Sequence, residues 1–198
     1  MPPATTSGRS GTRDRILRAS AELFRRHGYA GTGLKAILAA SDAPYGSLYH
    51  FFPGGKEELG VAALRTGGVT YRELVESFFA EGVDVVDATQ SFFEGAVELV
   101  EATNFADACP IATVALEVAS TNEPMREAAA EAFESWLVVV EQRFVEAGMS
   151  SSLARDVAVQ LFSMIEGAFV LSRTIRDAEP IRIVGRAAAT AVAAARGE

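Results

Sequence analysis

The chain has 198 residues, of which 49% are hydrophobic, and it carries a formal net charge of −8. This length suits one large domain or a small domain plus a larger one, and the composition suffices for a sizeable core. A single cysteine excludes a disulfide framework, and two histidines are too few for a zinc site within one chain. The sequence shows no secretory signal and no uninterrupted apolar run of about 18–20 residues, so a soluble, cytoplasmic protein is expected.

The charge is divided unevenly along the chain. Residues 1–66 contain nine basic and five acidic residues, a net charge of +4, whereas the remainder contains nine basic and twenty-one acidic residues, a net charge of −12. A basic N-terminal part on an acidic body is expected if only the first part meets the phosphates of a nucleic acid. Chance clustering of solvated charges is the alternative.

The first predicted elements are an arm and an amphipathic helix. Residues 1–11 are rich in Pro, Thr, Ser and Gly and are expected to form a flexible arm. With this arm, Arg9 and Arg13 could reach a neighbouring groove or phosphate. We expect Thr12 to cap a helix that runs to about His27, with one apolar stripe and most arginines off that stripe.

Two short helices follow. Thr32 is expected to cap a helix over residues 34–40, and Ser41-Asp42-Ala43 reads as a tight turn because Asp tolerates the left-handed conformation. Pro44 fits the first position of a third helix, which ends near residues 51–52, before Pro53-Gly54-Gly55. Two short helices joined by a tight turn behind an amphipathic helix indicate a helix-turn-helix, here over residues 12–60.

In a helix-turn-helix, the first turn of the second helix enters the major groove of DNA. A Gly at this place lets the backbone approach closely, and Tyr, Ser and His can donate to phosphates or base edges. The residues expected nearest the bases are Lys35, Tyr45, Gly46 and Ser47, with Pro44 beside them, and those expected to hold phosphates are Thr32, Tyr49, His50 and Lys56. The alternatives are that Tyr49 and His50 pack in a helical corner and that Lys56 is simply solvated.

The rest of the chain is predicted to be helical. The expected helices cover residues 56–80, 84–103, 110–119, 123–147, 151–176 and 181–196, with Asn122 capping the helix that follows it. No run of alternating β-branched residues appears, so we predict an all-α fold. Residues 61–198 would then form a ligand-binding and dimerisation bundle. The last helix has too many apolar positions for a single buried stripe, which favours a helical seam between two copies of the chain; burial within one chain is the alternative.

The body also contains most of the aromatic side chains. Most of them belong to an ordinary core, but a bundle with this many rings and methionines can leave an apolar cavity. The candidate ligand-binding residues are Phe78, Phe92, Phe105, Phe133, Trp136, Phe162, Met164 and Phe169. Because the body is strongly acidic, a mostly apolar, neutral or cationic molecule is expected there.

The sequence contains few residue patterns that indicate catalysis. Glu94, Glu98 and Glu101 share one helix face, a spacing that binds metal when histidines join from another helix, but the body has no histidine. A solvated acidic face is therefore the favoured interpretation, and neither catalysis nor a cofactor is expected.

The N-terminal 60 residues resemble the TetR/AcrR family of transcriptional regulators. The resemblance lies in Ile16-Leu17, Leu23-Phe24, Gly28-Tyr29, Thr32, Ile37, Gly46-Ser-Leu-Tyr-His50, Phe52-Pro53 and Lys56-Glu57. The segments Ala43-Pro44, Phe52 to Leu59 and Ala108 to Glu117 are similar to the LmrA/YxaF-like branch. Two residues depart from the pattern: Asp42 stands where Gly is frequent, and Tyr45 stands where Arg or Lys often meets DNA.

The resemblance implies about nine helices, a homodimer and a ligand cavity in the C-terminal domain, whose occupation releases the protein from its operator. We therefore expect a sequence-specific, ligand-responsive repressor that binds double-stranded DNA. A helical small-molecule carrier without DNA binding and an enzyme that uses the acidic helix face are the competing hypotheses.

Overall fold

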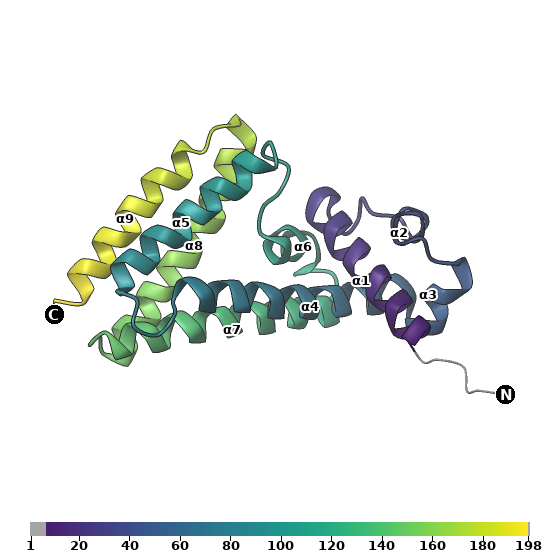
Figure 1. Ribbon diagram of the computed structural model, residues 1–198, viewed down its shortest axis with the longest axis horizontal. Helices are drawn as coiled ribbons and strands as arrows, with labels where there is room; N and C mark the ends of the chain where they lie inside the picture. The colour runs from purple at the N-terminus through teal and green to yellow at the C-terminus, as the bar shows by residue number, and fades with distance from the viewer. Residues whose placement is uncertain (1–6, 198) are drawn as a thin grey trace. The chain divides into compact units, whose positions relative to one another are not determined.

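The computed structural model describes residues 7–197, with side chains from Gly11 onward, and these residues form nine α-helices and no strand (Figure 1). The predicted all-α fold is confirmed. The helices are α1 (Ser7–His27), α2 (Leu34–Ser41), α3 (Tyr45–Phe51), α4 (Gly55–Phe78), α5 (Val85–Ala102), α6 (Pro110–Val118), α7 (Glu123–Glu146), α8 (Ser151–Ile175) and α9 (Glu179–Ala195).

The N-terminus of α1 differs from the prediction. The helix begins at Ser7, so Thr12 is inside it and not its cap, and residues 7–11 are helical where a flexible arm was expected. The sequence is misleading here because Ser, Gly and Thr are poor helix formers, yet extending an existing helix adds one hydrogen bond for each residue fixed. Residues 1–6 of the predicted arm lie outside the described residues.

The chain forms two compact units, and both draw on separated stretches. The first contains the residues up to Gly67 together with Pro110–Ala130, and the second contains Gly68–Cys109 together with the residues from Glu131 onward. The helices α4 and α7 each contribute to both units. The sequence predicts two domains, each a continuous stretch of chain, that meet at residue 60. The first unit of the structure also includes α6, which comes from a separate stretch.

In the first unit, α1 packs against α2, α3 and α6. One apolar side chain from each of four helices is fully buried, namely Ile16, Ile37, Leu48 and Ile111. These positions show why the sequence folds locally as it does. Burial of the apolar stripe of each short helix supplies the stability that a helix of seven or eight residues lacks on its own.

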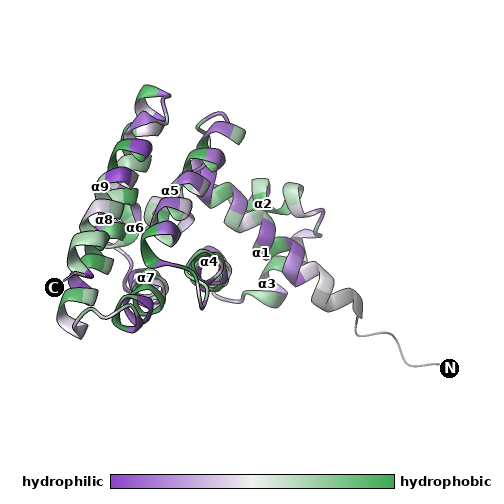
Figure 2. Cartoon of the chain, turned by 60° about the vertical axis from the view of Figure 1, so that its left-hand side comes forward, coloured by the Kyte–Doolittle hydropathy of each residue, from purple (hydrophilic) through white to green (hydrophobic). Residues whose placement is uncertain are grey.

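In the second unit, α9 packs against α5 and α8. Leu161 and Ile165 of α8 and Ile181 of α9 are fully buried. At Gly185 of α9, an added Cβ would lie 2.7 Å from the Cβ of Phe93, so glycine lets α9 approach α5 closely. Figure 2 shows hydrophobic and hydrophilic residues alternating around most helices, as expected where one side of each helix packs on a core.

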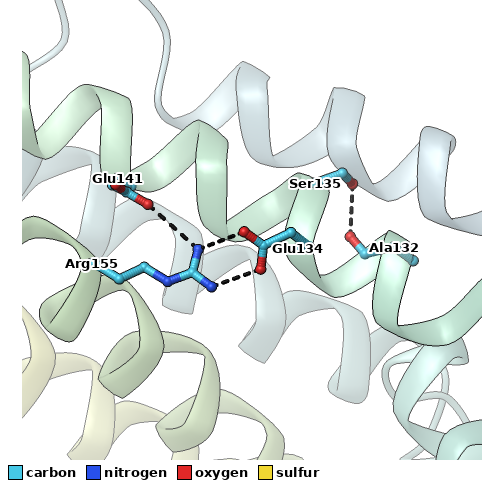
Figure 3. A network of polar contacts seen from close by, with 5 residues as sticks. All are labelled: Ala132, Glu134, Ser135, Glu141 and Arg155. Carbon is cyan, nitrogen blue, oxygen red and sulfur yellow. Dashed lines mark hydrogen bonds and ion pairs between the residues drawn. The ribbon is translucent and has the colours of Figure 1, made fainter. Parts of the chain in front are cut away.

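An ion-pair network joins α7 and α8 within the second unit (Figure 3). The guanidinium of Arg155 donates to both carboxylate oxygens of Glu134, at 2.9 and 2.7 Å, and to Glu141 at 3.4 Å. The two-pronged pairing with Glu134 fixes the angle of the guanidinium as well as its position. The helix α8 is long and apolar enough, by length and composition, to cross a membrane, but nine of its residues are buried among its neighbours, as in the core helix of a soluble bundle.

Candidate nucleic-acid interface and effector cavity

The turn between α2 and α3 is held by backbone and side-chain hydrogen bonds. Asp42 ends α2 in the left-handed conformation, with φ 48° and ψ 45°, as predicted. The guanidinium of Arg15 donates to the carbonyl oxygens of Ser41 at 3.0 Å and Asp42 at 3.4 Å. A cation at a helix C-terminus satisfies carbonyls that have no partner within the helix, so α1 fixes the geometry of the turn.

The helix α3 buries one side and exposes the other. Leu48 is completely buried, whereas Tyr45 is 61% exposed and Tyr49 is 47% exposed. The two tyrosine rings lie 6.0 Å apart between centroids, and the hydrogen bond between the two side chains is the main reason why the pKa of the Tyr49 phenol is raised. Two hydroxyls and two rings are therefore presented side by side on the exposed side of α3.

Other residues predicted to contact DNA lie on the same part of this unit. Pro44, Gly46 and His50 are exposed, and Ser47 is half-buried. Lys35 is exposed on α2 and lines one shallow depression together with Asp42 and Tyr45. The structure thus brings Lys35 and Tyr45 together, although they are ten positions apart in the chain.

Thr32 does not have the predicted geometry. Gly33 is the N-cap residue of α2, and it makes no side-chain capping bond. The side chain of Thr32 is 2% exposed, and its hydroxyl donates to the carbonyl oxygen of Gly28 at 2.7 Å. A buried hydroxyl must find a partner within the protein, so Thr32 serves the α1–α2 turn and its hydroxyl is turned away from solvent.

The basic residues near the helix-turn-helix also make internal contacts. The ammonium of Lys56 lies 4.3 Å from the centroid of the Tyr29 ring. Partial burial lowers the pKa of Lys56, and the negative charge of Glu117 opposes that shift. The guanidinium of Arg13 lies over the Phe52 ring at 5.4 Å, while Arg9 lies in α1 with its side chain outside the described residues.

Glu117 of α6 has a role that the sequence did not reveal. Its carboxylate accepts hydrogen bonds from the backbone N–H groups of Tyr29 and Ala30, at 3.1 and 2.7 Å. These residues begin the turn between α1 and α2, 87 or more positions away in the chain. The helix α6 therefore holds the segment that leads into the helix-turn-helix.

The second unit contains a cavity of about 460 Å³ that is partly open to solvent. The helices α4, α5, α7 and α8 line it, together with Cys109, which directly precedes α6. Five of the eight predicted ligand-binding residues are in the lining: Phe78, Phe92, Trp136, Phe162 and Phe169. Phe105, Phe133 and Met164 are half-buried outside it, and Phe133 packs edge-on against Trp136 with the ring centroids 5.3 Å apart.

Comparison with known proteins decides the family. Residues 16–63 match the family model for bacterial regulatory proteins of the tetR family, and residues 85–187 match that for the C-terminal domain of LmrA/YxaF-like transcriptional regulators. The chain is 35% identical to the HTH-type regulator YxaF of Bacillus subtilis, over 90% of this chain and 93% of YxaF. It is 34% identical to LmrA of the same organism, over 86% of this chain and 90% of LmrA.

The chain belongs to the TetR family of transcriptional regulators. Among solved structures, a TetR-family protein from Rhodobacter sphaeroides has the same fold, with a TM-score of 0.82, 22% identity and coverage of 91% of this chain and 98% of that one. The relatives and family models that match this chain are transcriptional regulators and not enzymes. The hypothesis of an enzyme is therefore wrong. Among the described residues, no group of three or more His, Cys, Asp or Glu could hold a metal ion.

The predicted acidic row of this TetR-family chain lies at the surface. Glu94, Glu98 and Glu101 are exposed, and Glu101 accepts a hydrogen bond from Arg182 of α9 at 2.6 Å. These carboxylates form a solvated row, in which Glu101 pairs with α9 and Glu98 also lines the cavity.

A polar pair in the cavity lining, Glu166 and Cys109, was among the residues that escaped the prediction. Glu166 of α8 lines the cavity and shares a side-chain hydrogen bond with the Cys109 thiol, and burial raises the pKa of Glu166 to about 7. Periodicity places an acid such as Glu166 on a helix, but it does not reveal whether that side of the helix meets solvent or an apolar hollow.

Proposed function

We propose that this TetR-family regulator is a repressor, bound to its operator through α2 and α3 and released when a small, mostly apolar, neutral or cationic molecule occupies the cavity of the second unit. The observation that carries this proposal is the cavity of about 460 Å³, with ring side chains in its lining. A cavity of this size, lined by aromatic and aliphatic groups with a few polar atoms, is typical of small-molecule sites.

The proposed DNA contacts rest on the exposed side of α3. Tyr45 and Gly46, with Lys35 of α2, would lie nearest the bases, because the first turn of this helix enters the major groove in helix-turn-helix proteins. Tyr49, His50 and Lys56 would hold phosphates. Thr32 is left out of this set since its hydroxyl is used inside the unit.

The chain itself offers a route from cavity to DNA. Cys109 lines the cavity, and the next residue, Pro110, begins α6. Glu117 of α6 then holds the turn that leads into α2. A ligand that displaces Cys109 would act on α6, and it must prefer the DNA-incompetent state by a few kcal/mol to shift the population usefully.

The proposal includes a homodimer through α8 and α9. Several apolar side chains of these helices are exposed: Val159, Val170, Leu171, Ile175 and Ile183. At Gly167 of α8, which is exposed, an added Cβ would meet nothing within 4 Å. Two copies related by a two-fold axis would cover this apolar surface, and the same symmetry would match a palindromic operator.

One experiment tests the function in two steps. The affinity of the purified protein for its own upstream DNA is measured at several salt concentrations, where a steep decrease with salt is expected. Compounds are then screened for quenching of Trp136, the only tryptophan, and each one that quenches is tested for release of the protein from DNA. A flat salt response would exclude the DNA contacts, and ligands that bind without changing DNA affinity would favour the carrier hypothesis.

A further inference from the structure

The ionisable side chains that line the cavity indicate which charge an effector should carry. Among the described residues that line it, the ionisable side chains are Tyr71 from α4, Glu98 from α5, Cys109 and Glu166 from α8, and no Arg, Lys or His lines it. Glu98 is exposed and therefore solvated, whereas Glu166 is largely covered by apolar neighbours. The charge that a bound molecule would meet away from water is thus negative.

The side chains that line the cavity around Glu166 provide no cation to pair with its carboxylate. The rings of Phe92, Trp136, Phe162 and Phe169 line the same cavity, and Cys109 donates a thiol hydrogen bond, a weak one. Arg173, two turns further along α8, donates to the carbonyl oxygens of Phe105 and Ala106 and does not line the cavity. Asp107, buried in the segment before Cys109, is also outside the lining.

A carboxyl group placed in this way discriminates between ligands by charge. A ligand carboxylate or phosphate would face a like charge with no basic side chain in the lining, which is strongly unfavourable in a site of low dielectric. A protonated amine would instead provide Glu166 with a cationic partner, which the cavity lining does not supply. Its charge would also face the surrounding aromatic rings, which attract cations through their quadrupoles.

We propose that Glu166 is the counter-ion that selects, as the effector of this protein, a monocationic amine with an aromatic or aliphatic body. This inference rests on the proposed function, since it assigns a ligand class to the same cavity. A neutral molecule of the same shape would fill the cavity and leave Glu166 protonated, so it would bind without the contribution of the ion pair.

The pairing makes binding depend on pH in a defined direction. The free protein has the carboxyl of Glu166 about half protonated near pH 7. A bound cation favours the carboxylate and lowers its pKa, so binding at pH 7 releases about half a proton and strengthens as the pH rises from about 6 to 8. The neutral molecule would show the opposite, weaker trend or none.

A matched series of probes tests this inference: diphenylpropylamine, diphenylpropanol and diphenylpropionate, which share one apolar body and differ in charge. Binding is measured by titration calorimetry in buffers of different ionisation enthalpy. We expect the amine to bind wild type about tenfold more tightly than the alcohol, with proton release, and the carboxylate to bind most weakly. In Glu166→Gln the preference for the amine and the proton release should both disappear, while Glu98→Gln should retain both.

Equal affinity for the amine and the alcohol in wild type, or the absence of amine binding, would overturn the inference. The pH dependence of wild-type binding provides a readout that does not depend on how well a variant folds. Failure of the proposed function has a separate signature, because the amine would then bind through Glu166 without releasing the protein from operator DNA.

Discussion

The carboxylate of Glu117 accepts a hydrogen bond from the backbone N–H of Ala30 at 2.7 Å. Together with the neighbouring bond from Tyr29, it connects α6 to the turn between α1 and α2. The first unit thus uses a helix from the middle of the chain to fix the segment that leads into its helix-turn-helix.

Replacing Glu117 by alanine should weaken both folding and DNA binding. The change removes two acceptors of backbone hydrogen bonds, which corresponds to a loss of about 1 kcal/mol in the free energy of unfolding. Affinity for upstream DNA should also fall, although a negative charge has been removed. Glu127→Ala is the control, because it removes the same charge from a side chain whose ion pair with Arg126 is a loose one of 3.9 Å. Equal weakening in both variants would count against a specific role for Glu117.

Gly28→Ala should be destabilising. Gly28 has a φ of +73°, and a Cβ there would lie 1.8 Å from Oε1 of Glu117. We expect a loss of about 2 kcal/mol in chemical denaturation, from the left-handed conformation and the displaced carboxylate. Gly33→Ala is the control, since φ is −86° and nothing lies within 4 Å of an added Cβ. If the displaced carboxylate matters, the losses of Gly28→Ala and Glu117→Ala will be less than additive in the double variant.

Gly46→Ala should change stability and DNA affinity in opposite directions. The position is exposed in α3, and an added Cβ meets nothing within 4 Å. Alanine favours a helix by up to about 1 kcal/mol relative to glycine, so the melting temperature should rise. A methyl group at a surface that approaches DNA closely should nevertheless weaken operator binding. Unchanged affinity would show that the backbone at Gly46 does not closely approach DNA.

Tyr45 and Lys56 should affect DNA recognition in different ways. Tyr45→Ala is expected to alter the preference among operator variants by about 1–3 kcal/mol at the base it reads. Lys56→Met keeps an apolar chain against Tyr29 but removes the charge, so it should weaken all sequences equally and reduce the salt slope by about one. Anisotropy titrations on an operator series distinguish the two effects. An unchanged salt slope in Lys56→Met would restrict Lys56 to its contact with Tyr29.

Glu166→Gln should stabilise the protein more at high pH than at low pH. The pKa of Glu166 is about 7 in the folded protein and about 4.3 for an unperturbed glutamate. The folded state therefore holds the proton more tightly, and this contribution to stability is present below pH 4 and lost as the pH rises to about 7. We expect the variant to gain on the order of 2 kcal/mol relative to wild type between pH 5 and pH 8, measured by thermal unfolding. Parallel pH profiles would contradict a buried carboxyl.

The sequence predicted all nine helices of the described residues, and several of their ends, though not the starts of α1 and α2, carry local signals that a sequence pattern records. Asp42 in the turn and Asn122 before α7 act as expected, and the Asn122 side chain accepts a hydrogen bond from the N–H of Met125 at 3.0 Å. Leu48 is buried and Tyr49 is exposed, as helical periodicity indicated. These features depend on a few neighbouring residues, which is what a sequence pattern records.

The features that the sequence did not predict mostly depend on contacts between residues that are distant in the chain. Thr32 is a residue type that often caps helices, but its hydroxyl donates to the carbonyl oxygen of Gly28 in the preceding turn. Glu117 contacts a backbone segment 87 positions away, and Glu166 meets Cys109 inside a cavity. An exposed acid and a buried one have the same helical periodicity, so only the packing of other helices around them distinguishes their roles.

The split composition of the first unit affects how the protein is made. During synthesis, the segments of α1, α2 and α3 leave the ribosome long before α6, because residues 68–109 come between them. Domains fold as units. The turn between α1 and α2 would therefore gain its hydrogen bonds to Glu117 only after α6 has been synthesised. A hybrid sensor built by joining the first 67 residues to a foreign effector domain would lack that helix, and it would need Pro110–Ala130 grafted along with them.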